Sequence, residues 1–313
     1  MLVLIIGTGN MAKEYAKVLE GLNVDFEVVG RGVVNCNLFK HLFPNKTFYS
    51  GGLESFKCNR PYSHGIICSN VEHLSNHTKL LIDSGIKFIL LEKPGGANLK
   101  EIIDLSSFVK KNGAKVAIAY NRRFYSSVLE CRKLIEEDGG VKSFHFEFTE
   151  WPHTIEFLEN YEIVKENLLI ANSTHIIDLA FFIGGAPREL KSFAIDKLEW
   201  HPKAIFSGAG ITVNNALFSY QANWKGPGRW HAEFITDKRR YIFKPIETLQ
   251  IQELKTVKVT QYEIDDKLDK LYKPGLFQQV NTFLFDPGNS SLIYLDQQEE
   301  NCQLIYKIIL DGN

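Results

Sequence analysis

The sequence predicts an α/β fold with two domains. Residues 1–121 are expected to form a domain on a parallel sheet, and residues 122–313 an α+β domain with an open-faced, mostly antiparallel sheet. Strand and helix patterns alternate over the first 120 residues, which requires crossover connections. The later strand-like runs are typical of antiparallel strands with one open face. A chain of 313 residues, 44% of them hydrophobic, suits two cores.

The elements of the first domain are read from apolar runs and helical spacing. Residues 2–6 form a continuous apolar run, as expected of a strand covered on both faces. Residues 10–19 place Met11, Tyr15 and Val18 on one side of a helix. The other predicted strands are 26–29, 64–69, 88–91 and 115–120, and the other predicted helices are 74–84 and 99–112.

The second domain begins with a segment at 141–150 that alternates apolar and polar residues, as a strand with one exposed face does. A helix is expected over 168–183. Strand-like runs follow at 189–196, 204–206, 211–221, 229–236, 240–243 and 248–253. Helices are expected at 276–283 and 291–310.

A glycine turn, Gly7-Thr8-Gly9-Asn10-Met11-Ala12, connects the first strand to the first helix. The first glycine permits the tight turn, and the second lets backbone N–H groups approach a pyrophosphate. The small third residue lets helix and strand pack closely. The helix N-terminus adds partial positive charge. This placement predicts a Rossmann domain that binds a nicotinamide dinucleotide through all six residues; the alternative is a glycine turn without a ligand.

The second strand ends in Gly30-Arg31, where an acidic residue would read the ribose of NAD. A guanidinium pairs with a 2′-phosphate in bidentate fashion, and Gly30 leaves room for it. The sequence therefore favours NADP over NAD, with Arg31 as the discriminating residue. The alternative is a solvated surface arginine.

Four short motifs follow one another in the N-terminal half, and a fifth lies in the C-terminal half. They are Gly7-x-Gly9-x-x-Ala12, Asn70-x-x-His73, Glu92-Lys93-Pro94, Asn121-Arg122-Arg123-Phe124, and His175-Ile176-Ile177-Asp178 followed by Gly184-Gly185. In this combination the chain resembles the glucose–fructose oxidoreductase / inositol dehydrogenase (Gfo/Idh/MocA) family. The resemblance implies hydride transfer between a nicotinamide and a carbinol or carbonyl carbon of a sugar or polyol.

The family pattern carries over to single residues. It implies that Lys93 contacts the reacting oxygen and that His175 is the acid/base. It also implies cofactor contacts from Ser69, Asn70, His73, Glu92, Lys93 and Asn121. The family often has Asp four residues before the histidine, where this chain has Ala171. Either Lys93 and His175 suffice, or another group such as Tyr120, His153 or Asp178 supplies the role, or catalysis is weakened.

Aromatic and cationic side chains gather on the predicted substrate side. Sugars stack on aromatic rings, and cations bind phosphates or carboxylates. This favours a sugar with a phosphate, nucleotide or acid group; the alternative is a turn whose tryptophans anchor the sheet. The substrate-binding candidates are Tyr120, Arg122, Trp151, His153, Asn172, Trp224, Arg229 and Lys273.

Composition excludes several other classes of protein. The formal net charge of −1 gives no overall field for gathering nucleic acid or anionic membrane. The five cysteines have no zinc spacing, and His73 and His77 lack a third ligand, so no metal site is expected. The apolar run at residues 1–6 ends at Gly7 and is expected to be a buried strand rather than a signal peptide or a membrane span. A reducing cytoplasm fits best, and a homodimer or homotetramer is expected through the open sheet face.

Two rival functions remain at this stage. A hydrolase or lyase that uses a dinucleotide transiently would retain its cofactor without net reduction. A non-catalytic NAD(P)-binding sensor or scaffold is suggested by Ala171.

Overall fold

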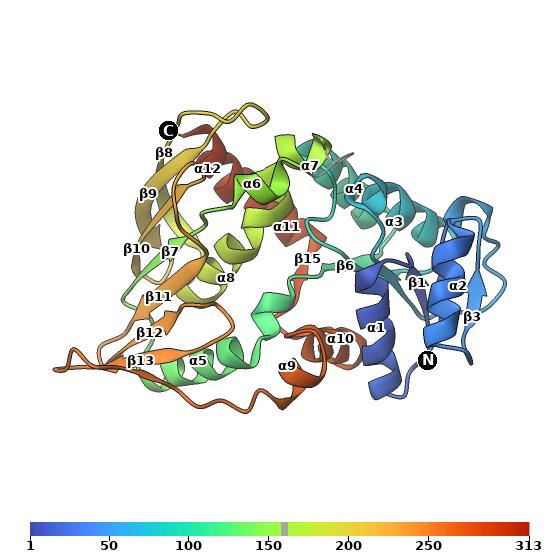
Figure 1. Ribbon diagram of the computed structural model, residues 1–313, viewed down its shortest axis with the longest axis horizontal. Helices are drawn as coiled ribbons and strands as arrows, with labels where there is room; N and C mark the ends of the chain where they lie inside the picture. The colour runs from blue at the N-terminus through green and yellow to red at the C-terminus, as the bar shows by residue number, and fades with distance from the viewer. Residues whose placement is uncertain (158–161, 313) are drawn as a thin grey trace. The chain divides into compact units, whose positions relative to one another are not determined.

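The computed structural model describes residues 1–157 and 162–312. The chain divides into two compact units (Figure 1). The first unit combines Met1–Asn121 with Leu268–Glu299, and the second combines Arg122–Lys267 with Glu300–Asn313.

The first unit is built on a seven-stranded sheet in the order β15-β6-β5-β4-β1-β2-β3. Strands β1 to β6 are parallel, and β15 alone is antiparallel. The order 3-2-1-4-5-6 is that of a dinucleotide-binding doubly wound sheet, and it places the topological switch between β1 and β4. The strands are β1 Leu2–Ile6, β2 Asp25–Val29, β3 Thr47–Tyr49, β4 His64–Ile67, β5 Phe88–Leu91, β6 Lys115–Ile118 and β15 Ile293–Tyr294.

Helices cover this sheet and bury the apolar strands; Val3, Leu4 and Ile5 of β1 are fully buried. Most of these helices agree with the pattern of the sequence, whereas helix α2 and the short strand β3 were not predicted from it. The α-helices of the first unit are α1 Asn10–Gly21, α2 Val33–Leu42, α3 Leu74–Asp83, α4 Leu99–Lys111, α10 Leu276–Phe285 and α11 Leu295–Asn301, and the 3-10 helices are η1 Leu53–Ser55 and η2 Val71–His73.

The segment Leu268–Glu299 differs from the expected contiguous second domain, because it packs with the first unit. Ile293 pairs with Ile118, so β15 completes the hydrogen bonding of β6, and α10 packs against α1. The helix expected over 291–310 is therefore interrupted. It consists of β15, α11, the π-helix η5 Cys302–Tyr306 and α12 Lys307–Asp311, and α12 packs on β8 of the second unit.

The second unit contains an eight-stranded sheet in the order β14-β13-β12-β11-β7-β10-β9-β8. Every pair except β7–β10 is antiparallel, which confirms the predicted mostly antiparallel sheet. The run predicted at 211–221 is two strands joined by a turn at Asn215, whose φ is 63°. The strands are β7 Ser143–Glu147, β8 Pro187–Ile195, β9 Ile205–Thr212, β10 Leu217–Asn223, β11 His231–Ile235, β12 Arg239–Phe243, β13 Gln250–Glu253 and β14 Val259–Gln261.

One face of this sheet is covered by helix α8, Thr174–Gly184, which lies against β7 and β11 (Figure 1). Phe181 of α8 packs on Phe144 and Phe218, with ring centroids 6.0 and 5.1 Å away. The remaining helices of this unit are the 3-10 helix η3 Asn121–Phe124, α5 Ser126–Glu137, α6 Pro152–Ile155, α7 Glu162–Glu166, α9 Lys267–Leu271 and the π-helix η4 Leu169–Ser173. Helices η3, α9 and α11 each contain residues of both units.

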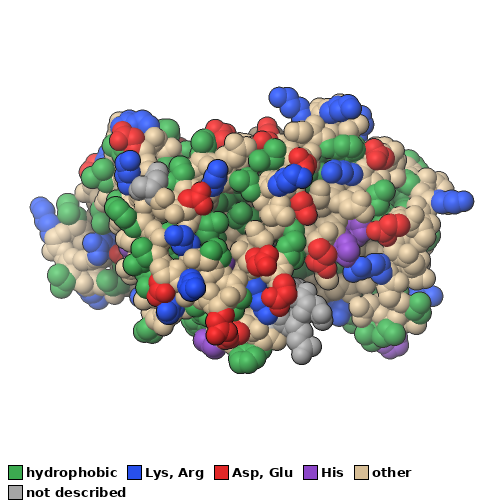
Figure 2. All heavy atoms as spheres, turned by 90° about the horizontal axis from the view of Figure 1, so that it is seen from above, with side chains coloured by type: hydrophobic (Ala, Val, Ile, Leu, Met, Phe, Trp, Pro, Cys, Tyr) green, Lys and Arg blue, Asp and Glu red, His purple; other side chains and the backbone are tan. Residues whose placement is uncertain are grey.

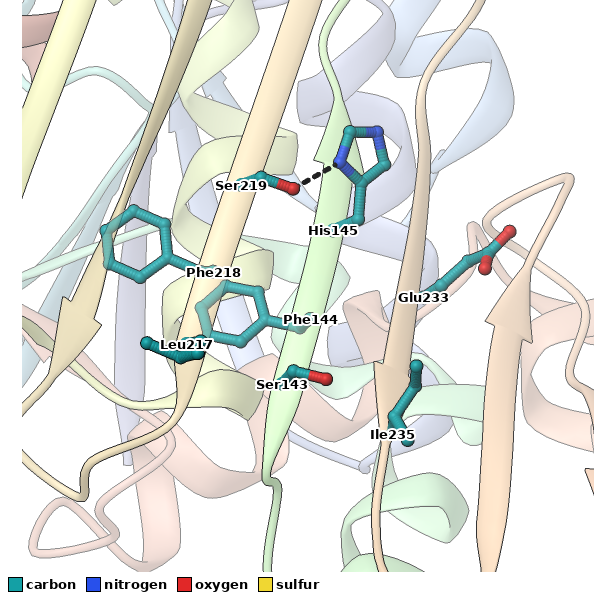
Figure 3. Close-up of a pocket in the computed structure, with 8 residues that line it drawn as sticks. All are labelled: Ser143, Phe144, His145, Leu217, Phe218, Ser219, Glu233 and Ile235. Carbon is teal, nitrogen blue, oxygen red and sulfur yellow. Dashed lines mark hydrogen bonds between the residues drawn. The ribbon is translucent and has the colours of Figure 1, made fainter. Parts of the chain in front are cut away.

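The other face of the sheet is open and carries polar and apolar side chains together. Figure 3 shows His145 of β7 beside Ser219 of β10, with Nδ1 and Oγ 2.9 Å apart. Phe193, Ile195 and Leu217 are each more than half exposed. A sheet face of this composition suits contact with another protein surface.

Charged side chains of both signs are mixed on the face of the molecule shown in Figure 2, without a continuous area of one sign. This distribution agrees with the formal net charge of −1. Among the described residues, no helix combines the length and apolar character that a membrane span needs.

Asp138, directly after α5, is a buried carboxylate that fastens β11 and β12 to this helix. Its Oδ2 accepts hydrogen bonds from Tyr241 Oη at 2.7 Å and Thr236 Oγ1 at 2.9 Å, and Arg239 Nε donates to it at 3.0 Å. Burial opposes ionisation, but these donors outweigh it and lower the pKa of Asp138 to about 2. The carboxylate therefore stabilises the fold above the unfolded pKa of about 3.9, and this stabilisation is lost as pH falls through the folded pKa.

Asp138→Asn is accordingly expected to lower the free energy of unfolding at pH 7 by about 2 kcal/mol. The deficit relative to the parent should shrink as pH falls from about 4 towards 2. Denaturant unfolding across this pH range measures both effects. The neighbouring, largely exposed Asp237 forms a surface ion pair with Lys142, so Asp237→Asn is the control. Equal stability of Asp138→Asn and the parent at pH 7 contradicts the prediction.

Candidate functional site

A cavity of about 350 Å³ opens in the first unit at the carboxyl ends of β1, β2 and β4. This is the switch point of the sheet, where doubly wound folds bind their ligands. The cavity brings together several of the predicted cofactor residues. Its lining includes Gly7, Thr8, Gly9, Gly30, Arg31, Gly52, Ser69, Asn70 and His77.

The glycine turn has the local geometry that its sequence predicts. Gly7 has a φ of 124°, and a Cβ there would lie 2.8 Å from the carbonyl oxygen of Cys68. Gly9 caps helix α1, and a Cβ on it would meet no atom of the described part of the chain within 4 Å. Ala12 is fully buried. The turn thus presents backbone and the N-terminus of α1 to the cavity, which is the arrangement that binds a pyrophosphate.

The end of β2 has no room for the acidic side chain that reads the ribose of NAD. A Cβ on Gly30 would lie 2.5 Å from Thr8 Cγ2 and 2.9 Å from Cys36 Sγ. Arg31 follows at the cavity, with its Nη1 2.8 Å from His73 Nε2. Because a guanidinium only donates, His73 accepts through Nε2 in this contact. Arg31 and His73 therefore meet beside the predicted adenosine end of the cavity.

His77 is a cavity residue that the sequence analysis did not assign to the cofactor site. It is 3% exposed and stacks on His73, with ring centroids 5.4 Å apart. Its Nδ1 lies 2.9 Å from Ser69 Oγ, and its Nε2 lies 3.3 Å from Glu54 Oε1. Burial lowers the pKa of His77, and Glu54 opposes this shift. These contacts fix the loop that carries Ser69 and Asn70.

The Glu92-Lys93-Pro94 turn follows directly after β5. Glu92 accepts a hydrogen bond from Tyr15 Oη of α1 at 2.7 Å. Burial raises the pKa of Glu92, while this hydrogen bond and the charges of Lys93 and Lys273 oppose the shift. Gln298 Nε2 of α11 donates to the carbonyl oxygen of Pro94 at 3.1 Å. The turn is thus held from both sides, and the half-buried Lys93 extends from a fixed backbone.

Tyr120 and Asn121, just after β6, form hydrogen bonds with the segment Leu268–Glu299. Tyr120 is 1% exposed, and its hydroxyl accepts a hydrogen bond from Gln298 at 3.0 Å. Asn121 Nδ2 donates to the carbonyl oxygen of Pro274 at 2.9 Å. These contacts give both residues a role in packing, whereas the predicted contacts of Tyr120 with substrate and of Asn121 with cofactor stay predictions.

His175 lies at the start of α8, directly after the π-helix η4. It is 7% exposed, and its ring centroid lies 6.2 Å from that of Trp230. Asp178, one turn later, forms a buried bidentate pair with Arg123, with contacts of 2.7 and 2.6 Å. Asp178 is therefore committed to the fold, and the suggestion that it replaces an aspartate at the position of Ala171 is not supported.

Glu150 supplies a carboxylate beside this helix, and the sequence analysis missed it. It is 1% exposed and accepts hydrogen bonds from Asn172 Nδ2 at 3.0 Å and from Ser173 Oγ at 2.7 Å. The sequence contained a signal for this residue. Glu150 lies two and four residues after the inward-facing Phe148 and Phe146, and alternate side chains of an extended segment point to the same face. The carboxylate thus reaches the turn just before His175 from the segment that follows β7, rather than from position 171.

The aromatic candidates of the second unit separate into two groups. Trp224 is 1% exposed, and its Nε1 donates to the carbonyl oxygen of Phe148 at 3.2 Å. It belongs to the core of the sheet, so the prediction that it contacts substrate is wrong. Trp151 is 44% exposed and donates through Nε1 to the carbonyl oxygen of Gly228 at 2.8 Å, with His153 stacked on it at 6.0 Å. Arg229 lies over Trp151 and Trp230.

Comparison with known proteins gives similarity in structure only. No family model and no curated protein matches the sequence. A Gfo/Idh/MocA family oxidoreductase from Vibrio cholerae has a TM-score of 0.77 at 14% identity, with 99% of this chain and 97% of that chain covered. An oxidoreductase from Agrobacterium radiobacter has a TM-score of 0.77 at 12% identity, covering 100% and 97%.

UDP-N-acetylglucosamine 3-dehydrogenase from Acidithiobacillus ferrooxidans has a TM-score of 0.74 at 12% identity, again covering 100% and 97% of the two chains. These similarities extend over the full length and confirm the predicted fold class. They also confirm the predicted resemblance to Gfo/Idh/MocA proteins at the level of the fold.

Proposed function

We propose that the protein is an NAD(P)-dependent oxidoreductase that transfers a hydride between the nicotinamide and a carbinol or carbonyl carbon of a sugar or sugar derivative. The observation that carries this proposal is the pairing of two features in one sheet. A glycine turn opens the cavity at the β1/β4 switch, and the fixed turn that carries Lys93 follows β5, the neighbour of β4.

Proteins of this fold support the reaction class. The Agrobacterium radiobacter oxidoreductase was determined in complex with NAD+ and L-tartaric acid. Another similar structure, at a TM-score of 0.76 and 15% identity, is levoglucosan dehydrogenase in complex with NADH and levoglucosan. L-tartaric acid and levoglucosan are both small molecules with a carbinol carbon, and each is bound together with a nicotinamide cofactor.

The residues at the switch point fit a dinucleotide. The cavity is open where a Cβ on Gly9 would point, and backbone N–H groups at the start of α1 are directed to anionic ligands there. When bound, the nicotinamide donates or accepts the hydride. Lys93 donates a hydrogen bond to the reacting oxygen, and His175 takes or returns the hydroxyl proton. Asn172 and Ser173, held by Glu150, fix the helical turn that presents His175.

The function is tested by incubating the purified protein with NADP or NAD and a panel of neutral and anionic saccharides, while the absorbance of the reduced nicotinamide is followed. Net reduction or oxidation of added cofactor with at least one saccharide is expected. Turnover of a saccharide without net change in reduced nicotinamide would point to a hydrolase or lyase. Cofactor binding without any turnover would point to a sensor.

We further propose that NADP is preferred to NAD, because Arg31 reads the 2′-phosphate at a site where Gly30 excludes an acidic side chain. Arg31→Gln is expected to raise the Kd for NADP by about 10- to 100-fold, since a hydrogen bond to a charged group is worth about 1.5–3 kcal/mol. The Kd for NAD should stay within about twofold of the parent value.

Titration calorimetry with both cofactors measures this difference. The exposed Lys40 of α2 does not line the cavity, so Lys40→Gln controls for the loss of one positive charge. The proposed preference is wrong if the parent binds NAD more tightly, or if Arg31→Gln weakens both cofactors equally.

The open sheet face is the surface through which we propose that the chain forms a homodimer or homotetramer. Its exposed Phe193, Ile195 and Leu217 would be covered in such an assembly.

A further inference from the structure

Two guanidinium groups lie on a single indole ring in the second unit. The Cζ atoms of Arg122 and Arg229 each lie 4.7 Å from the ring centroid of Trp230. Arg229 is also 4.7 Å from the ring centroid of Trp151. His175 lies beside the same indole, so both cations are close to the proposed proton-transfer group. We call Arg122 and Arg229 the arginine pair.

The acidic groups around the arginine pair do not fully satisfy it. Glu150 Oε2 lies 3.6 Å from Arg229 Nη1, but this carboxylate already accepts hydrogen bonds from Asn172 and Ser173. Glu247 is exposed and acts on Arg122 only through its field. Within residues 1–157 and 162–312, Arg122 forms no ion pair, and its buried Nε has no hydrogen-bond partner.

Placing two cations against one indole ring has an energetic cost. Burial lowers the pKa of Arg122, and the charge of Arg229 acts in the same direction. Stacking on Trp230 fixes the planes of both guanidinium groups while leaving their N–H edges available. An anion at these edges would relieve the repulsion and satisfy the unpaired donors.

We propose that the substrate is an anionic saccharide whose phosphate or carboxylate group is bound by Arg122 and Arg229 beside His175. This inference rests on the proposed function, and it narrows the substrate from sugars in general to those with a negatively charged group. A neutral sugar would leave the donors of Arg122 without an acceptor of equal strength.

The test uses the full chain loaded with its preferred cofactor, titrated calorimetrically with four probes. These are glucose 6-phosphate, glucuronate, UDP-N-acetylglucosamine and neutral glucose, with inorganic phosphate and UDP alone as additional arms. At least one anionic saccharide is expected to bind 10-fold or more tightly than glucose, and its affinity should weaken as salt is raised. The arm with the tightest binding identifies the source of the anion, since free phosphate or UDP lacks the sugar.

Arg122→Met is expected to weaken that anionic ligand by about 10- to 100-fold and to weaken glucose by a smaller factor. Arg122→Lys keeps the charge but loses the planar fork, so an intermediate affinity is expected. Arg132→Met is the matched control, because Arg132 also lies over a ring in this unit, 4.2 Å from the centroid of Phe182. Thermal unfolding of each variant shows whether it is folded.

The inference is overturned if glucose binds as tightly as every anionic probe, or if folded Arg122→Met and Arg132→Met bind the best anionic ligand equally. Failure of the proposed function is a separate result. If a neutral saccharide is oxidised and the anionic ones are not preferred, only the present inference fails. If an anionic saccharide binds through Arg122 but neither NADP nor NAD binds, the anion site stands and the oxidoreductase proposal fails.

Discussion

Replacing Lys93 with methionine is expected to lower kcat for hydride transfer by about 10²- to 10³-fold, as removal of one hydrogen-bond donor to a reacting oxygen does in other enzymes. The ammonium group stabilises negative charge that develops on the oxygen, and methionine has similar length but no donor. The hydrogen bond from Gln298 to the Pro94 carbonyl and the Tyr15–Glu92 contact hold the turn, and the bonded atoms of both belong to residues other than Lys93. The fold should therefore survive the change.

The measurements are steady-state kinetics with the best saccharide and the Kd for the cofactor. The cofactor Kd should change by less than about fivefold, because the pyrophosphate is held by the glycine turn. Lys100→Met is the control, since Lys100 is an exposed residue of α4 that pairs with Asp104. A Lys93→Met variant with kcat close to that of the Lys100→Met variant would show that another group donates the hydrogen bond to the reacting oxygen.

The parts of the fold that sequence could predict are those specified by neighbouring residues. The buried run Leu2–Ile6 and the glycine turn lie in one short stretch, and each obeys a local rule. The alternation of strands and helices through Asn121 similarly predicted the parallel sheet. The missed helix α2 exposes Val33, Val34 and Leu38, so it lacks the regular apolar face by which helices are recognised.

The parts that could not be predicted depend on contacts between distant residues. Leu268–Glu299 returns to the first unit because β6 is completed by β15 and because Gln298 reaches the Pro94 carbonyl. Periodicity carries no information about such a return, so the segment was assigned to the second domain. The family spacing, with an aspartate four residues before the histidine, also gave no answer here, because Ala171 stands at that position.

The carboxylate near His175 comes from outside the helix. Glu150 follows β7 and hydrogen-bonds Asn172 and Ser173, which lie in a π-helical turn rather than an α-helical one. Single-turn π-helices often occur at functional sites. The absence of an aspartate at position 171 therefore does not by itself argue against catalysis, and a buried glutamate with inward parity is the signal to look for in related sequences.

Gly9→Ala is expected to raise the Kd for the cofactor by about 100-fold, or about 2.7 kcal/mol, while the fold is preserved. A side chain would be excluded at Gly7 and at Gly9 for different reasons. A Cβ on Gly7 would collide with the Cys68 carbonyl at a φ of 124°, so a change there damages the fold itself. Gly9 has a φ of −77° and open space around its Cβ position, which alanine can occupy in the free protein.

The same Cβ would occupy the place where the pyrophosphate approaches the start of α1, so the loss should appear only in binding. Alanine is a poorer N-cap than glycine, so the free energy of unfolding is expected to fall by up to about 1 kcal/mol. Calorimetric titration gives the Kd, and denaturant unfolding gives the stability. Gly288→Ala is the matched control, because Gly288 also has open space at its Cβ and lies outside the cavity lining. If Gly9→Ala and Gly288→Ala bind the cofactor equally well, the pyrophosphate does not lie on the glycine turn, and the cavity at the β1/β4 switch must be assigned to another ligand.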